Sequence, residues 1–211
     1  RKGIDTALSA GLNVSVNLHH LRIHQFNDLI EPPLYTDPAA QEKFAQYWRD
    51  VQSALKDYST NRVAFEFLNE PVARDNERWN TVWRIAYDIL RPAEPNRTLI
   101  LGSNLWNQTR TFADLAVPVE DTHMILDFHF YEPLLVTHTN SYVPWTNTPW
   151  QVNYPGKPFK MPSWLFGLYS NLKPKLNPVH RKDVWHENDA FTKDTILERF
   201  MKAIVVAKEH G

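Results

Sequence analysis

The sequence predicts an α/β fold with about five parallel strands and flanking helices. Short apolar runs rich in β-branched and aromatic residues alternate with longer amphipathic stretches, which is typical of βαβ units. Polar, chemically capable residues gather where the apolar runs end, as they do in parallel α/β folds. The chain has 211 residues, of which 43% are hydrophobic and 22% are charged. We therefore expect a single domain covering residues 1–211.

Five apolar runs are expected to form the strands, because each is rich in residue types that favour a pleated, half-buried surface. These runs are residues 13–18 (NVSVNL), 63–69 (VAFEFLN), 98–102 (TLILG), 124–131 (MILDFHFY) and 184–187 (VWHE). An eight-unit β/α barrel typically needs about 250 residues, so five units in this chain leave three unaccounted for.

The first two helices have clear end signals. Residues 4–10 are expected to be the end of a helix that stops at Gly11, since glycine readily ends helices. Asp37 is expected to cap a second helix, because the following Pro38 suits the first helical position. The apolar stripe of this second helix comprises Phe44, Tyr47, Trp48, Val51 and Leu55.

Two later helices are predicted from their apolar periodicity. Residues 77–90 form the first, and Pro92 is expected to end it. Its stripe comprises Trp79, Val82, Trp83, Ala86 and Ile89. The second is expected to run from a cap at Thr192 or Asp194 to about Lys208. Its inward-facing residues are expected to be Ile196, Phe200, Ile204 and Val205.

The composition excludes several classes of function. The formal net charge is −1, so no basic field would hold nucleic acid. No apolar run is long enough to span a membrane, and residues 1–5 are too polar for a secretion signal. Cysteine is absent, and with only 6 glycines the chain has neither a Gly-rich nucleotide loop nor a Gly-x-Ser-x-Gly turn. We therefore expect no cofactor.

Aromatic residues make up 13% of the chain, and many lie in the Pro-rich stretch 132–164. Trp106, which follows the third run, and Trp145, Trp150 and Tyr154 are candidate stacking platforms, because flat rings suit the apolar faces of sugars. The alternative for each is that the ring fills or covers the core.

Histidines cluster behind the first run. Alternation places Asn17 and His19 on one face of the strand, with His20 and His24 nearby. Their spacing matches no recognised metal-ligand pattern, and no carboxylate lies close in the sequence. We therefore expect a hydrogen-bonding role for His19 and no metal site.

Acidic residues accompany the second and fourth runs. In FEFLNEP, Glu66 is expected to be buried and held by structural hydrogen bonds, because burial of an unpaired carboxylate is costly. Alternation is expected to place Glu66, Leu68 and Glu70 on one face, with Glu70 at the open end of the run, where a ligand can reach it. In DFHFYEP, alternation places Asp127, His129 and Tyr131 on one face.

The last run ends in VWHEND, which puts Glu187 at a strand end equivalent to that of Glu70. The two carboxylates are far apart in sequence and are expected to be adjacent in space. Such a pair is what glycoside hydrolysis needs, since one group protonates the leaving oxygen and the other attacks or stabilises the sugar.

These residues resemble glycoside hydrolase family 5, a large group of cellulases and related enzymes built on the (β/α)8 barrel. The most specific match is FLNEP, which implies that Glu70 is the acid/base and that Asn69 donates to the substrate 2-hydroxyl. VSVNLHH resembles the third-strand motif, with Asn17 in place of an aspartate and His19 in the sugar-contacting position.

The resemblance continues on the later strands. His129 and Tyr131 match the sixth-strand His-x-Tyr motif, which implies that Tyr131 hydrogen-bonds the nucleophile. Glu187 aligns with the nucleophile itself, although residues 186–189 read His-Glu-Asn-Asp where the family usually reads Gly-Glu-Phe-Gly. The match covers the third to seventh βα units and implies a partial (β/α)8 TIM barrel. It lacks the strands that carry the family's arginine and its tryptophan platform.

The resemblance implies a retaining endoglucanase-like hydrolase that cleaves β-1,4-glucan, with mannan or another β-glucan as the alternative substrate. The expected partner is a β-glucan polysaccharide or oligosaccharide, and the family favours a secreted or periplasmic location. Two other readings stay open. The chain is a noncatalytic fragment that binds carbohydrate, or it requires association with another copy or segment to cover its open sheet edges.

Overall fold

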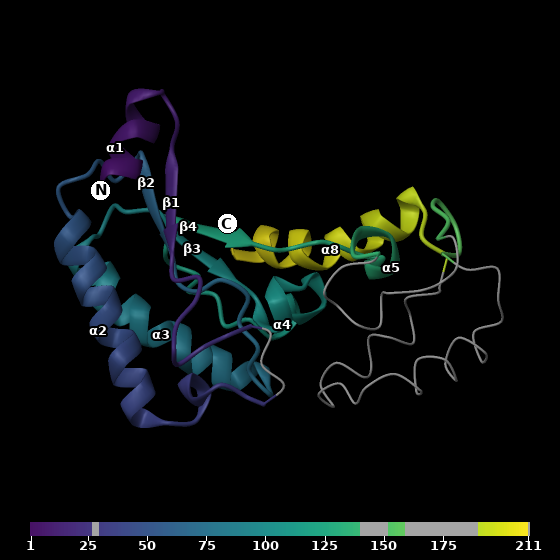
Figure 1. Ribbon diagram of the computed structural model, residues 1–211, viewed down its shortest axis with the longest axis horizontal. Coiled ribbons are helices and arrows are strands. Elements are labelled where there is room, and N and C mark those ends of the chain that lie inside the picture. The colour runs from purple at the N-terminus through teal and green to yellow at the C-terminus, as the bar shows by residue number, and fades with distance from the viewer. Residues whose placement is uncertain (27–29, 140–151, 159–189, 211) are drawn as a thin grey trace. The chain divides into compact units, whose positions relative to one another are not determined.

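The computed structural model describes residues 1–26, 30–139, 152–158 and 190–210 (Figure 1). The chain divides into two compact units, one formed by Arg1–His129 with Lys202–Gly211 and the other by Phe130–Met201. The first unit contains a four-stranded parallel sheet with the order β1-β2-β3-β4. The strands are β1 (Val14–Asn17), β2 (Val63–Glu66), β3 (Leu99–Gly102) and β4 (Met124–Asp127).

These strands confirm the positions of the first four predicted runs, but β2 and β4 end at Glu66 and Asp127, earlier than the runs 63–69 and 124–131 predict. The predicted run 184–187 lies outside the described residues. The sheet is accompanied by four longer helices, which are α1 (Lys2–Ser9), α2 (Pro38–Leu55), α3 (Asn76–Ala93) and α8 (Lys193–His210). The short helical segments are η1 (Pro33–Tyr35), α4 (Asn104–Asn107), η2 (Thr109–Asp114) and α5 (Leu134–Thr137). Among the described helices, none is long and apolar enough to cross a membrane.

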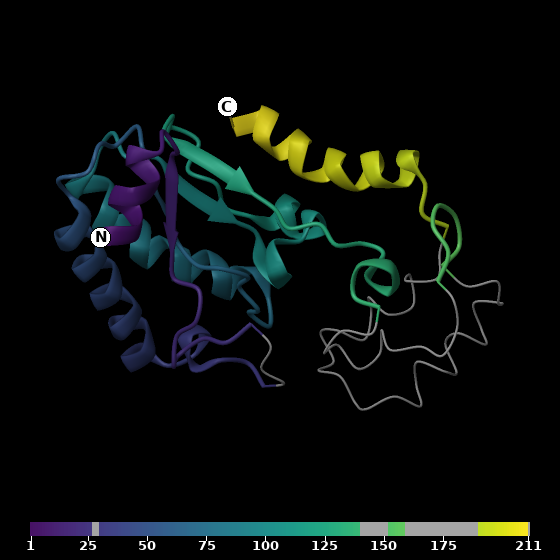
Figure 2. The ribbon, with the colours of Figure 1, turned by 45° about the horizontal axis from the view of Figure 1, so that its top comes forward.

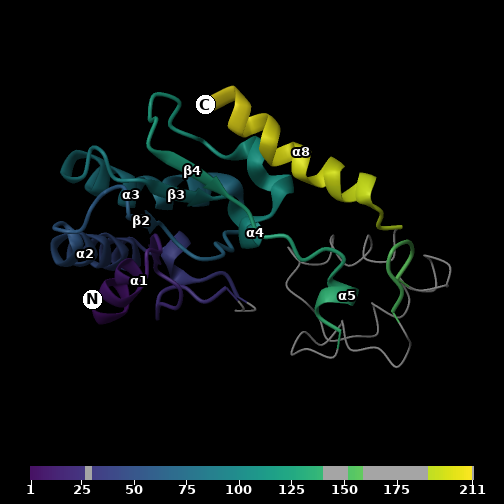
Figure 3. The same cartoon turned by 90° about the horizontal axis from the view of Figure 1, so that it is seen from above.

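The helices α2 and α3 connect successive strands and lie side by side against one face of the sheet (Figure 3). The helix α1 contacts β1 and lies at its amino end (Figure 2). As predicted, α1 ends before Gly11, whose φ of 81° is a left-handed value that glycine adopts without strain. The predicted cap of α2 is also confirmed, because the Asp37 carboxylate accepts a hydrogen bond of 2.9 Å from the Ala39 N–H.

The helix α3 begins one residue before its predicted start and ends later than expected. Pro92 was expected to stop it at Leu90, but the helix continues to Ala93 with Pro92 inside its last turn. Proline removes only one N–H donor there, and the turn is completed by the Glu94 N–H, which donates to the Leu90 carbonyl oxygen at 2.8 Å.

The helix α8 is capped by Thr192, whose hydroxyl accepts a hydrogen bond of 3.3 Å from the Thr195 N–H. The expectation that Val205 faces inward is wrong, because its side chain is 45% exposed. Ala203 and Val206 are the residues of this helix that enter the core of the first unit. At 100° per residue, Val205 lies almost opposite Ala203 on the helix, whereas Val206 lies close to the face of Ala203.

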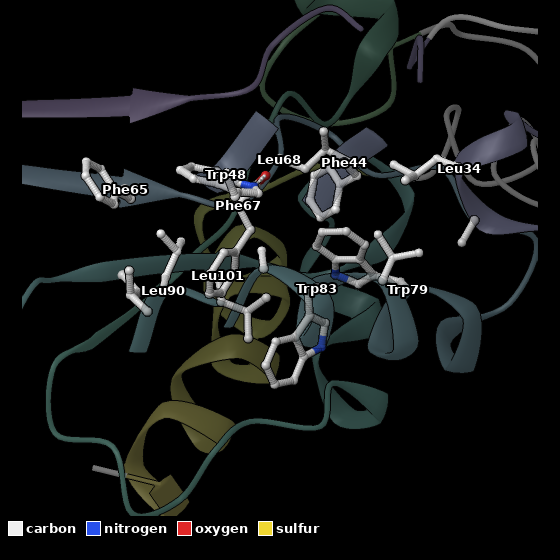
Figure 4. Close-up of a cluster of buried hydrophobic side chains, with 14 of the residues drawn as sticks. Leu34, Phe44, Trp48, Phe65, Phe67, Leu68, Trp79, Trp83, Leu90 and Leu101 are labelled. Atoms are coloured by element: carbon white, nitrogen blue, oxygen red, sulfur yellow. Dashed lines mark hydrogen bonds between the residues drawn. The ribbon is translucent and has the colours of Figure 1, made fainter. Parts of the chain in front are cut away.

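The hydrophobic core lies between the sheet and the helices α2 and α3 (Figure 4). Val63, Phe65, Leu99 and Leu101 are fully buried on the helix-covered face of the sheet. Large aromatic rings fill the layer, with Trp48 and Phe65 5.8 Å apart and Phe67 stacked on Trp83 at 6.1 Å. The indole N–H of Trp48 donates to the Phe67 carbonyl oxygen at 3.2 Å, so its polar atom is satisfied.

The amino ends of β2 and β3 are joined by Arg97, whose side chain is fully buried. Its guanidinium donates to the carbonyl oxygens of Val63 at 2.7 Å and Tyr58 at 3.0 Å. It also pairs with the Glu94 carboxylate at 3.1 Å and lies 4.5 Å from the centre of the Phe65 ring. A buried charge is tolerated here because every side of the guanidinium meets an acceptor or a ring.

Candidate active site

The last residues of the four strands form a row at the carboxyl edge of the sheet. Asn17, Glu66, Gly102 and Asp127 are the last residues of β1, β2, β3 and β4. The register pairs Asn17 with Glu66 and Gly102 with Asp127 across neighbouring strands. In parallel α/β folds ligands bind beyond this edge of the sheet, so the row marks the candidate site.

The turn at residues 69–72 carries Glu70 above the row. The strand alternation expected through Glu70 ends at Glu66, because Phe67 and Leu68 both lie in the hydrophobic core. Glu70 has a φ of 49°, a left-handed conformation that is uncommon for a residue other than glycine and is followed here by Pro71. Strained backbone of this kind persists where the surrounding structure fixes it, and it is frequent at functional sites.

Glu70, His129 and Asp127 form a linked group of titratable side chains. The Nδ1 atom of His129 lies 2.8 Å from Glu70 Oε1, and its Nε2 atom lies 3.6 Å from Asp127 Oδ2. The hydrogen bond to Glu70 raises the pKa of His129, the charge of Asp127 adds to this effect, and burial opposes it. The side chain of Glu70 is 15% exposed, so it is held in place and still open to a ligand. The predicted common face of Asp127 and His129 is confirmed.

Asp127 is held by Asn107, whose Nδ2 atom donates to Asp127 Oδ2 at 2.7 Å. Asn107 is fully buried and has a φ of 55°. Its side chain lies directly against Gly102, where an added Cβ atom would come within 2.2 Å of Asn107 Nδ2. Glycine is therefore required at the end of β3 because the Asn107 amide occupies the space of a side chain.

Glu66 accepts hydrogen bonds from the Ser15 hydroxyl at 3.4 Å and from the Asn17 amide at 3.5 Å. The expected structural hydrogen bonds are therefore present. The expectation of a packed interior is wrong within the described residues, since Glu66 is only half-buried. Burial raises the pKa of Glu66, and the nearby charge of Asp127 raises it further.

Aromatic rings gather beside the Glu70 turn. The exposed His19 and His20 rings contact each other and Phe26, with centroid distances of 5.0 to 5.9 Å. The indole N–H of Trp106 donates to the Phe26 carbonyl oxygen at 2.8 Å, and its backbone N–H donates to the Pro71 carbonyl oxygen at 3.0 Å. Two hydrogen bonds thus anchor Trp106, one to Phe26 and one to Pro71 within the turn itself.

The other predicted site residues belong to the second unit or lie outside the described residues. Tyr131 belongs to the second unit, where it is 50% exposed and its ring makes an edge contact with His138 at 5.2 Å. Tyr154 also belongs to that unit and is 50% exposed. Glu187, Trp145 and Trp150 lie outside the described residues, so the pairing of Glu70 with Glu187 stays a prediction.

No sequence pattern pointed to Tyr35, Asn107 or Gly102 as part of the site, and His24 was grouped with the exposed histidines. His24 is instead 1% exposed and hydrogen-bonded to Tyr35 and to the backbone of Asn69. The one available signal for His24 was its position among apolar residues in LRIHQF. No group of three His, Asp or Glu side chains suited to a metal ion occurs within the residues that the structure describes.

Comparison with known families agrees with this arrangement. The model of the family described as Cellulase (glycosyl hydrolase family 5) matches residues 1–206. The chain belongs to glycosyl hydrolase family 5. The resemblance inferred from FLNEP and the neighbouring motifs is thereby confirmed.

Known proteins share part of the sequence, and a solved structure shares the fold. Endoglucanase C of Acetivibrio thermocellus is 31% identical over 152 residues, which cover 69% of this chain and 43% of the relative. Cellodextrinase A of Ruminococcus flavefaciens is 29% identical over 142 residues, which cover 65% of this chain and 41% of the relative. A structure of Thermotoga maritima Cel5A in complex with cellobiose has a TM-score of 0.62 and 25% identity, and the match covers 88% of this chain and 54% of that one.

These matches confirm the predicted fold class, a partial (β/α)8 barrel with a parallel sheet and flanking helices. The chain spans about half the length of the family-5 relatives it matches.

Proposed function

We propose that this chain carries the acid/base part of the active site of a retaining, endoglucanase-like hydrolase that cleaves β-1,4-glucan. The observation that most supports this proposal is the position of Glu70. Its carboxylate follows β2 at the carboxyl edge of the sheet and hydrogen-bonds His129 at 2.8 Å, within the FLNEP motif of a family-5 chain. Ligand-accessible carboxylates at this edge are suited to acid/base chemistry on a sugar.

The proposed reaction is a double displacement. Glu187 attacks the anomeric carbon while Glu70 protonates the leaving oxygen, and Glu70 then removes a proton from the water that releases the sugar. Direct attack requires carboxyl groups about 5 to 5.5 Å apart. The hydrogen bond to Glu70 raises the pKa of His129, so the imidazole beside the proposed acid/base stays protonated to higher pH than a free imidazole does.

The remaining site residues are proposed to hold the glucan. Asn69, which is 6% exposed and adjacent to Glu70, would donate to the substrate 2-hydroxyl. Tyr131 would hydrogen-bond the nucleophile. His19 and His129 would each hydrogen-bond the sugar. The sugar rings would stack on Trp106, Trp145 and Trp150. Trp106 is anchored at both its indole and its backbone N–H, so its ring would meet a sugar without first being ordered.

The decisive variant is Glu70→Gln, tested on aryl β-cellobiosides with good and poor leaving groups. We expect hydrolysis of the poor leaving group to fall by about 10²- to 10⁴-fold, since it depends on positioned acid catalysis. For the substrate with the good leaving group, the rate of the first step, formation of the glycosyl enzyme, should fall far less. Glu66→Gln is the matched control, because this carboxylate lies in the same row and is tied to Ser15 and Asn17. It should change both substrates by the same factor, and equal losses for Glu70→Gln would contradict the acid role.

A second candidate function is carbohydrate binding without turnover, or turnover only after self-association. This candidate is kept because the four strands that the structure describes do not by themselves close a barrel. Release of reducing sugar from soluble β-glucan separates the readings, and a size measurement in solution detects association. Parallel assays on β-1,4-glucan and mannan test the substrate, for which we expect the glucan to be preferred.

A further inference from the structure

Two buried side chains from the segment before α2 hold the backbone on both sides of Glu70. The Nε2 atom of His24 lies 3.3 Å from the Asn69 carbonyl oxygen, and the Tyr35 hydroxyl lies 3.2 Å from His24 Nδ1. The same hydroxyl accepts a hydrogen bond of 2.8 Å from the Val72 N–H. His24 is 1% exposed and Tyr35 is 4% exposed. The two side chains therefore bridge residues 69 and 72 away from water.

The contacts from the Asn69 carbonyl through His24 and Tyr35 to the Val72 N–H form a hydrogen-bond relay. The two backbone groups at its ends fix the direction of each hydrogen bond. The Val72 N–H can only donate, so the Tyr35 oxygen accepts and its own proton is directed to His24 Nδ1. The Asn69 carbonyl can only accept, so His24 Nε2 carries the ring proton. Burial lowers the pKa of His24 to about 4, with a smaller lowering from the charge of His20, which keeps the imidazole neutral near pH 7. A neutral His24 with its proton on Nε2 satisfies all three contacts.

The backbone between these anchors is the strained part of the turn. Glu70 has a φ of 49° and precedes a proline. Steric clashes disfavour this combination in a chain that no other contacts hold in place. The relay binds the residue before Glu70 and the second residue after it. The Pro71 carbonyl oxygen is held separately by the Trp106 N–H at 3.0 Å. From this backbone conformation Glu70 makes its 2.8 Å contact with His129.

We propose that His24 and Tyr35 are positioning residues for Glu70, which hold its turn so that the carboxylate stays aimed at the reacting oxygen. The inference rests on the acid/base role proposed above for Glu70. Neither side chain needs to touch the substrate. Their effect reaches the reaction through the Asn69 carbonyl and the Val72 N–H, and a displacement of about 1 Å in an acid/base group is enough to cost on the order of 10²-fold in rate.

The test is Tyr35→Phe, which removes one oxygen and keeps the ring. Its matched control is Tyr58→Phe, because this change also removes one hydrogen-bonding hydroxyl, which donates to the Asp5 carboxylate at 2.6 Å in an exposed position far from the turn. Both variants and the native chain are assayed on phenyl and dinitrophenyl β-cellobiosides. For Tyr35→Phe we expect kcat for the phenyl substrate to fall about 10- to 100-fold with KM unchanged. The dinitrophenyl substrate should form the glycosyl enzyme at the native rate, and Tyr58→Phe should match the native chain on both.

A pair of variants at His24 keeps the inference testable if Tyr35→Phe fails to fold. His24→Leu removes both polar atoms, whereas His24→Gln retains one amide donor and one carbonyl acceptor. We expect the leaving-group dependence to appear in His24→Leu and to be largely restored in His24→Gln. Independently of turnover, hydrogen exchange of the Val72 amide should be at least about tenfold faster in Tyr35→Phe, because its acceptor is lost.

The outcomes separate this inference from the proposed function. If Glu70→Gln shows the leaving-group dependence but Tyr35→Phe and His24→Leu do not, the positioning role is overturned and the acid/base role stands. The same holds if these variants lose activity equally on both substrates, since that is what general destabilisation gives. If Glu70→Gln itself lacks the dependence, the proposed function fails first and the inference fails with it.

Discussion

At the amino ends of β2 and β3, Arg97 is fully buried, pairs with Glu94 and donates to backbone carbonyls. At the carboxyl ends, Glu70 and His129 form a pair whose side chains are 15% and 24% exposed. Both ends bring charges together. At the amino ends, the charge of Arg97 is completely surrounded by partners. At the carboxyl ends, the Glu70–His129 pair is partly exposed, and Glu70 has a left-handed backbone.

The difference indicates what each end contributes. A charge that is fully surrounded by partners cannot meet a ligand, so the amino end serves the stability of the sheet. A half-buried pair retains the capacity to exchange a proton and to contact a sugar, at the expense of local backbone strain. The two ends should therefore respond differently to substitution and to pH.

The largest expected effect on stability is at the amino end. Arg97→Met should lower the free energy of unfolding by about 3–5 kcal/mol, because Glu94 would be left buried without its partner. Urea unfolding followed by tryptophan fluorescence measures this. The control is Arg49→Met, whose ion pair with Glu42 is 44% and 70% exposed and should contribute at most about 1 kcal/mol. A similar loss for both variants would contradict the assigned role of the amino end.

A somewhat smaller effect is expected from acid at the carboxyl end. His24 has a pKa of about 4 when folded and 6.5 when unfolded, so between these values the unfolded state binds more protons. Stability should therefore be fully present above pH 6.5 and should fall by about 3 kcal/mol as the pH drops through 4. Unfolding measured at pH 7 and near pH 4 tests this in the native chain and in His24→Gln. The variant should lack this part of the decline, and an identical decline in both proteins would exclude His24 as its source.

The smallest of the three effects is expected at Gly102. Gly102→Ala would push its Cβ atom into the Asn107 amide and displace Asn107 from Asp127, which should cost about 1–3 kcal/mol. Thermal unfolding gives the change, with Gly3→Ala as the control. Gly3 has open space around it in α1, so alanine there should be neutral or stabilising by at most about 1 kcal/mol. If Gly102→Ala behaves like Gly3→Ala, close packing at the end of β3 is not required.

Much of the framework could be predicted because its signals are local. The apolar runs located β1 to β4, and Asp37 with Pro38 located the start of α2. The predicted group of Asp127 and His129 followed from simple alternation along one strand and its extension. These features depend on residues that are close in sequence.

The site itself depends on contacts that are distant in sequence. Nothing in FEFLNEP shows that alternation stops at Phe67 or that Glu70 adopts a left-handed backbone, because the anchors come from His24 and Tyr35. Arg97 was missed for the same reason, since its acceptors include Tyr58 and Val63 on other segments. Val205 was misplaced because apolar residues lie on more than one face of α8, and the face that enters the core is set by contacts with other elements.

The conformation of Glu70 has a consequence for protein engineering. The substitution that would best relax its backbone is glycine, and that change would delete the carboxylate. Heat tolerance therefore cannot be improved at this position without removing the group that the turn presents. Mutant libraries for thermal selection should keep residues 69–72 constant and vary solvent-facing positions of α2 and α3, where beneficial substitutions do not compete with the site.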